Sequence, residues 1–232
     1  MSTPRGSTSH AFTPFGIRPA DEALPGLVSG TFNLLEAPDA TAADVALAHF
    51  LHQTLKRGAR AALVTLDSPE WRLAQFARYG FDFADALEDD RLAYVYYRPT
   101  LSRFLGAGAD YGSLFGELRR LAGPVERVGF LNPEIMFDLG TDALATDSVK
   151  RFVAGADKLG GTALGVCVPD ATESQARLRK AGARLFAGAF ALRRGSSHAA
   201  DDYVLESVRD RVPGVNLVLR QGRGYVADAH VA

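Results

Sequence analysis

The chain has 232 residues, of which 47% are hydrophobic and 23% charged, and this length is enough for one large domain with a substantial core. The 26 lysines and arginines are balanced by 27 acidic residues, so no broad basic face for nucleic acid is expected. The single cysteine, Cys167, excludes a disulfide framework and a zinc site built from several thiolates.

The amino terminus differs in composition from the rest of the chain. Residues 1–12 are rich in serine, threonine, proline and glycine, and we expect them to form a disordered tail. Residues 13–232 show no linker and no internal repeat, so they are expected to form a single domain. No apolar run approaches the roughly 18 residues that cross a bilayer, and the start of the chain lacks the layout of a signal peptide. We therefore expect a cytoplasmic protein without direct membrane insertion.

From residue 27 onward, apolar runs alternate with segments of helical periodicity. A strand is predicted over 28–35, followed by a helix over 41–56 that Gly58 ends. The apolar run 61–66 is typical of a strand in a parallel sheet, and Ser68-Pro69-Glu70 is a typical start for the helix that runs to about residue 79. Further helices are predicted over 83–88, 111–121, 146–159 and 172–181, the last ended by Gly182, and further strands over 92–97, 127–131 and 162–168.

The pattern changes in the last quarter of the chain. Strands are predicted over 185–193, 203–208 and 215–218, with short turns and no helices between them. Alternation of strands and helices indicates a mainly parallel sheet with helices on both faces, and the terminal strands indicate an antiparallel carboxyl-terminal edge. The predicted fold class is therefore α/β. His49 and His52 lie in the helix over 41–56, where we expect a structural role.

The amino-terminal half carries a family resemblance. Its order of features is similar to the opening of KaiC-type RecA-like ATPases, in which a glycine-rich lead-in precedes a strand, a phosphate loop, a helix and a second strand. The matching residues are Gly16-Ile17, Asp21, Leu24, Gly26, Gly30, 46–51, Lys56-Arg57-Gly58, 63–70 and Tyr79-Gly80-Phe81. The resemblance implies a RecA-like sheet with a phosphate loop over residues 37–44.

The residues expected to bind phosphate at that position are replaced. A phosphate loop needs the pattern G-x-x-x-x-G-K-[ST]. Ala37 and Ala42 stand in place of its two glycines, Ala43 in place of its lysine and Asp44 in place of its hydroxyl. Asp44 brings a negative charge to a polyanion site, and we expect it to interact with the dipole of the following helix as a phosphate would. Asp39 is a second acid in this segment, with no cation beside it.

Two further positions of the implied site are also altered. Asn132 follows the strand 127–131, where the resemblance implies a metal-binding aspartate, and an amide is a poorer ligand for Mg²⁺. Asp67 remains from an implied acidic pair that activates water, and its side chain is one methylene shorter than that of glutamate. Because all three parts are altered together, we predict a pseudo-ATPase with no catalytic residues, no bound cofactor and no metal.

Within that superfamily, the chain resembles the amino-terminal domain of the BcsE family, regulators of bacterial cellulose secretion. The resemblance implies a scaffold or regulatory subunit that docks onto a second copy or onto a P-loop ATPase of a membrane-associated complex. The candidate interface is the aromatic cluster Trp71, Phe76, Tyr79 and Phe81, with core packing as the alternative. Two other functions stay open: an ATP-binding or ATP-hydrolysing regulator with a non-standard phosphate site, and a small-molecule enzyme on the same sheet.

Overall fold

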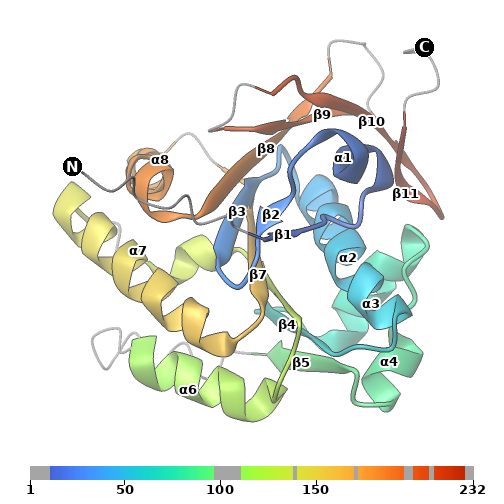
Figure 1. The fold of residues 1–232 in the computed structure, drawn as a ribbon, viewed down its shortest axis with the longest axis horizontal. Coiled ribbons are helices and arrows are strands. Elements are labelled where there is room, and N and C mark those ends of the chain that lie inside the picture. The colour runs from blue at the N-terminus through green and yellow to red at the C-terminus, as the bar shows by residue number, and fades with distance from the viewer. Residues whose placement is uncertain are drawn as a thin grey trace, which may run out of the picture.

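The computed structural model describes residues 11–96, 111–137, 140–169, 172–195, 201–208 and 212–227. It is an α/β fold built on a nine-stranded sheet in the order β11-β10-β9-β8-β3-β7-β6-β4-β5 (Figure 1). The parallel part consists of β3 (Phe32–Glu36), β4 (Ala61–Thr65), β5 (Leu92–Tyr96), β6 (Arg127–Leu131), β7 (Thr162–Cys167) and β8 (Gly188–Arg194), and the antiparallel edge of β9 (Asp202–Ser207), β10 (Val215–Arg220) and β11 (Gly224–Ala227).

Helices cover both faces of the parallel strands, as the α/β prediction requires. One face carries α1 (Arg18–Ala23), α2 (Ala40–Lys56), α3 (Pro69–Arg78) and α4 (Ala84–Glu88); the other carries α6 (Tyr111–Ala122), α7 (Asp142–Ala156) and α8 (Glu173–Leu185) (Figure 1). Every residue of β4, β6 and β7 is buried, which explains why these strands are mostly apolar in sequence. The described elements have a RecA-like layout, with an antiparallel carboxyl-terminal edge.

A cluster of aromatic rings fixes the strands that end at the candidate site. Phe152 of α7 makes edge-to-face contacts with Phe32, Phe115, Phe130 and Phe137, with ring centroids 4.9–5.8 Å apart. On the opposite face, α2 buries most of its residues against the sheet. Packed side chains therefore cover β3 and β6 on both faces of the sheet.

Several predicted helix ends are confirmed where the sequence carries a capping residue or a glycine. Ser68 caps α3 by accepting a hydrogen bond from the Trp71 N–H at 3.5 Å, and Pro69 occupies the first turn. Gly58 follows the end of α2 with φ 78°, in the left-handed region that favours glycine.

Other boundaries were predicted wrongly. The run 28–35 is not one strand, because Gly30 turns the chain with φ 70° between β2 (Leu27–Val28) and β3. β2 instead pairs with β1 (Phe12–Thr13), so the end of the predicted tail 1–12 is ordered; residues 1–10 lie outside the described residues. The predicted strand 92–97 ends at Tyr96 as described, and Tyr97 lies outside the described residues.

Two helices also extend beyond their predicted limits. α7 begins four residues early because the side chain of Thr141 caps it, accepting from the Leu144 N–H at 3.2 Å. α8 continues through Gly182 to Leu185. Gly182 serves packing rather than termination there, because a Cβ at this position would lie 2.4 Å from the Phe186 ring. β8 accordingly begins at Gly188, and it runs parallel to β3 although it was predicted within the antiparallel edge.

Candidate functional site

The candidate site lies at the carboxyl ends of the parallel strands, where open α/β sheets commonly bind their ligands. Only Ala37, Pro38 and Asp39 separate β3 from α2. Ala42, Ala43 and Asp44 therefore lie in the first turns of a helix rather than in a loop, and the segment predicted as a degenerate phosphate loop has become a short strand-to-helix connection.

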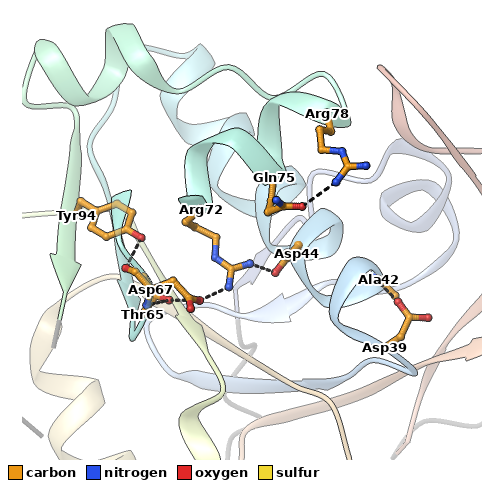
Figure 2. A network of polar contacts seen from close by, with 9 residues as sticks. All are labelled: Asp39, Ala42, Asp44, Thr65, Asp67, Arg72, Gln75, Arg78 and Tyr94. Atoms are coloured by element: carbon orange, nitrogen blue, oxygen red, sulfur yellow. Dashed lines mark hydrogen bonds and ion pairs between the residues drawn. The ribbon is translucent and has the colours of Figure 1, made fainter. Parts of the chain in front are cut away.

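Asp39 occupies the amino terminus of α2. Its Oδ1 accepts a hydrogen bond from the Ala42 N–H at 2.8 Å, and its Oδ2 pairs with the Arg194 guanidinium at 2.5 Å (Figure 2 shows the first contact). The structure thus corrects two predictions. Asp39, not Asp44, satisfies the helix terminus, and Asp39 does have a cation, which comes from β8.

Asp44 takes part in a buried ion-pair network. Arg72 of α3 donates hydrogen bonds to the carboxylates of both Asp44 and Asp67, and only 4% of Arg72 is exposed (Figure 2). One guanidinium therefore links α2, α3 and the end of β4. Sequence reasoning missed Arg72; its only signal was the i, i+4 spacing to Phe76, which places it on the buried face of α3.

Asp67 is fixed further by its neighbours. The Thr65 Oγ1 accepts from the Asp67 N–H at 3.2 Å, and the Tyr94 hydroxyl donates to the Asp67 carbonyl at 2.9 Å (Figure 2). The carboxylate that would have to activate water is itself engaged by Arg72 and by the Thr65 hydroxyl, which donates to the Asp67 Oδ2 at 3.3 Å. Such a carboxylate stabilises the fold, and it is poorly placed to accept a proton from a substrate.

Burial dominates the electrostatics of the network. It raises the pKa of Asp44 to about 6, although Arg72 acts in the opposite direction, and the negative charge of Asp67 adds to the increase. A buried carboxylate is tolerated only when a cation and hydrogen bonds compensate its lost hydration. Arg72 therefore supplies the positive charge that Asp44 and Asp67 need inside the protein.

Asn132 lies at the end of β6 in the left-handed conformation, with φ 52° and ψ 52°. Asparagine tolerates this conformation better than most residues, so the backbone conformation alone accounts for an asparagine at this position. The Asn132 N–H donates to the Val166 carbonyl at 2.9 Å. The structure brings Asp44 and Asp67 together through Arg72, whereas the backbone of Asn132 is bonded to β7 through Val166 and to the following turn through Ile135.

The predicted interface cluster is only partly at the surface. Trp71 is 51% exposed, and Tyr79 is partly buried. The prediction that Phe76 and Phe81 belong to an interaction surface is wrong, because both are core residues: Phe76 packs edge-to-face against Phe83, and Phe81 against His49. The core-packing alternative holds for these two side chains.

His49 joins the two ends of the described chain to α2. Its Nδ1–H donates to the Gly16 carbonyl at 3.1 Å, and its Nε2 accepts from the Tyr225 N–H at 2.8 Å. This arrangement requires the neutral ring, and burial lowers the pKa of His49 to about 4. Gly224 must be glycine, because a Cβ there would lie 2.4 Å from the His49 Nε2. The predicted structural role of His49 is confirmed.

The burial of Cys167 allows the rigidity of the strand ends at the candidate site to be tested. The residue is fully buried at the end of β7, its carbonyl accepts from the Ala37 N–H at 2.8 Å, and burial raises the pKa of its thiol well above the ordinary value. We expect Ellman's reagent at pH 8 to modify Cys167 only as fast as the protein unfolds, because the thiolate is the reactive form. Rapid modification of the native protein, at the rate seen in denaturant, would contradict a rigid site.

Among the described residues, no group of three or more histidine, cysteine, aspartate or glutamate side chains is placed to hold a metal ion. Within the same ranges, no helix is both long enough and apolar enough to span a bilayer. Neither a model of a known protein family nor any curated protein matches the sequence. The function of this chain is therefore inferred from the geometry of the site.

Proposed function

We propose that this domain is a catalytically inactive relative of RecA-like ATPases that acts as a scaffold or regulatory subunit in the cytoplasm. The observation that supports this most directly is the Arg72 network. An internal guanidinium pairs with the carboxylates of Asp44, at the implied phosphate-loop hydroxyl, and of Asp67, at the implied base position. The side chain of Asp39 caps the helix that would face a phosphate. All three carboxylates therefore already have partners within the chain.

Restoring the phosphate-binding lysine tests this proposal. We expect Ala43→Lys to leave Mg²⁺-ATP binding undetectable in a calorimetric titration, because Asp39 and Asp44 still repel the phosphates and Ala43 itself is a buried helical position. The same substitution at the exposed position Ala40, at the start of the same helix, is the matched control. Tight binding gained by Ala43→Lys alone would favour the alternative, an ATP-dependent regulator with a non-standard phosphate site.

Docking is the second part of the proposal. Trp71 is half exposed on the first turn of α3, directly beside the buried Arg72, whose guanidinium carbon lies 4.6 Å from the centre of the indole ring. Exposed tryptophans are frequent anchors of protein interfaces. The sequence resemblance to the BcsE family suggests two partners, a second copy of this chain or a P-loop ATPase encoded beside it in a polysaccharide-secretion system.

Light scattering at tens of micromolar, with the protein alone and mixed with a co-encoded P-loop ATPase, tests the docking face. We expect Trp71→Ala to weaken assembly at least about tenfold, the loss typical of an interface anchor. Leu144→Ala is the matched control, because Leu144 is 45% exposed on α7, on the opposite face of the sheet. A strict monomer that binds no such partner, or assembly that both variants reduce equally, would contradict the placement.

A further inference from the structure

A cavity of about 610 Å³ lies beside the start of α2, separate from the Arg72 network. Its walls come from the first turn of α2, the end of α3 and the antiparallel edge of the sheet, and they include Arg78, Tyr79, Arg194, Asp201 and Tyr203. Figure 2 shows Arg78 and Asp39 on the side of α2 that faces away from Asp67. The volume is within the range of pockets that hold small molecules.

Tyr203 is the most informative side chain of this cavity. It is only 3% exposed, its ring packs edge-to-face on Tyr225 at 5.5 Å, and the Arg194 guanidinium carbon lies 4.9 Å from its centroid. Within the described part of the chain, neither its hydroxyl nor that of Tyr79 has a hydrogen-bond partner. Neither hydroxyl is one of the fully buried polar atoms that lack a partner, so both are reached from the cavity and can bond to a ligand that enters it.

The groups around Tyr203 bear on its protonation state. Asp39, Arg194, Asp201 and Tyr79 line the same cavity as Tyr203, and each of them acts on its pKa. Burial is the main reason that the pKa of Tyr203 is raised. The phenol therefore stays protonated at neutral pH and can donate a hydrogen bond to whatever enters.

The donors of the cavity exceed its acceptors. Asp39 already pairs with Arg194 and caps α2. Arg78 is exposed, and its guanidinium donates a long hydrogen bond of 3.4 Å to the Gln75 amide oxygen. One guanidinium and two phenol hydroxyls thus remain for a ligand, while Asp201 supplies the opposing charge. Such a set of donors suits oxygen atoms that carry negative charge.

We propose that this cavity binds a small oxyanionic group, a phosphate or a carboxylate, through Arg78, Tyr79 and Tyr203. Arg78 supplies the charge, and the two hydroxyls orient the oxygen atoms. The site requires neither Mg²⁺ nor a nucleotide, so it does not depend on the loss of ATP binding at residues 37–44. The two proposals can therefore fail separately.

Calorimetric titrations with sodium phosphate and with sodium acetate, at constant ionic strength in chloride, test the site. We expect saturable millimolar binding of at least one anion. Tyr203→Phe should weaken it about tenfold, the value of a hydrogen bond to a charged group, and should leave the melting temperature of the free protein unchanged because no internal hydrogen bond is lost. Arg78→Gln should weaken it as well. Tyr94→Phe is the matched control, because the Tyr94 hydroxyl is engaged with Asp67 elsewhere.

Asp201→Asn decides the sign of the charge that the cavity prefers. An oxyanion should bind severalfold more tightly once this carboxylate is removed, whereas a cationic or sugar-like ligand would lose a partner. Stronger binding of phosphate than of acetate assigns a phosphate group, and the reverse assigns a carboxylate. The proposal is overturned if neither anion binds at about 50 mM, if Tyr203→Phe binds as tightly as the wild type, or if Asp201→Asn binds more weakly.

Discussion

Replacing Arg72 by methionine should lower the free energy of unfolding by about 3–5 kcal/mol at pH 7, because it leaves Asp44 buried without its cation. Methionine keeps much of the volume, so the loss reports on charge rather than on a cavity. Urea denaturation measures it. Arg78→Met is the control, since Arg78 lies on the same helix but is exposed, and we expect that variant to change stability by less than about 0.5 kcal/mol.

The pH dependence of this loss identifies its cause. Without Arg72, the folded-state pKa of Asp44 should rise above about 6, while the unfolded value stays near 3.8. A group with a raised folded pKa contributes stability below its unfolded pKa, and this contribution disappears as the pH rises through the folded pKa. The deficit of Arg72→Met relative to the wild type should therefore shrink as the pH falls from 8 to 5. A deficit below about 1 kcal/mol, or one independent of pH, would show that the network carries little energy.

The protein should also lose stability in acid through His49. The ring has a pKa of about 4 when folded, against 6.5 for the ordinary side chain, so the unfolded state binds more protons between these values. Stability then falls as the pH decreases from about 6.5 to about 4, by about 3 kcal/mol in total at roughly 1.4 kcal/mol per pKa unit. Protonation would also break the bond from Tyr225 N–H to Nε2.

His49→Gln separates this effect from that of other titrating groups. Glutamine can still accept from the Tyr225 N–H, but it cannot titrate. Asp44 changes stability in the opposite direction over part of the same range, and it does so in both proteins, so it cancels in the comparison. We expect the wild type to lose more stability than His49→Gln between pH 7 and pH 5. Parallel curves for the two proteins would rule out the neutral buried ring.

The sequence predicts this fold well where the signals are local. Ser68-Pro69 and Gly58 marked helix ends because capping and left-handed backbone depend on neighbouring residues only. Gly182 was misleading for the opposite reason. The helix continues past it, and its close contact is with the ring of Phe186, the residue that follows the helix. The sequence pattern shows neither the continuation nor this contact. The order of strands and helices follows from periodicity, and the split of 28–35 depends on pairing between β1 and β2.

The sequence placed the segment 37–44 between a strand and a helix, but it did not show the contacts of its side chains. The departures from the phosphate-loop pattern can be seen in the sequence, whereas the ion pairs of Asp39 and Asp44 cannot. Asp39 and Arg194 are 155 residues apart, and Arg72 reaches Asp44 across 28 residues. These partners meet only because the sheet brings β8 and α3 to the two sides of α2. Burial of Phe76 and Phe81 depends on the same packing, so an aromatic cluster in sequence became core rather than surface.

A calorimetric titration of the wild-type protein with ATP and Mg²⁺ tests the central proposal, that the chain's own side chains occupy the position where the RecA-like resemblance implies a nucleotide. The loss of the lysine, the glycine cradle and the metal ligand should each cost about 1 kcal/mol or more. We predict no binding tighter than about 1 mM and no release of phosphate over the same period. A dissociation constant in the low micromolar range that requires Mg²⁺, or ATP turnover that Asp67→Ala abolishes, would contradict it.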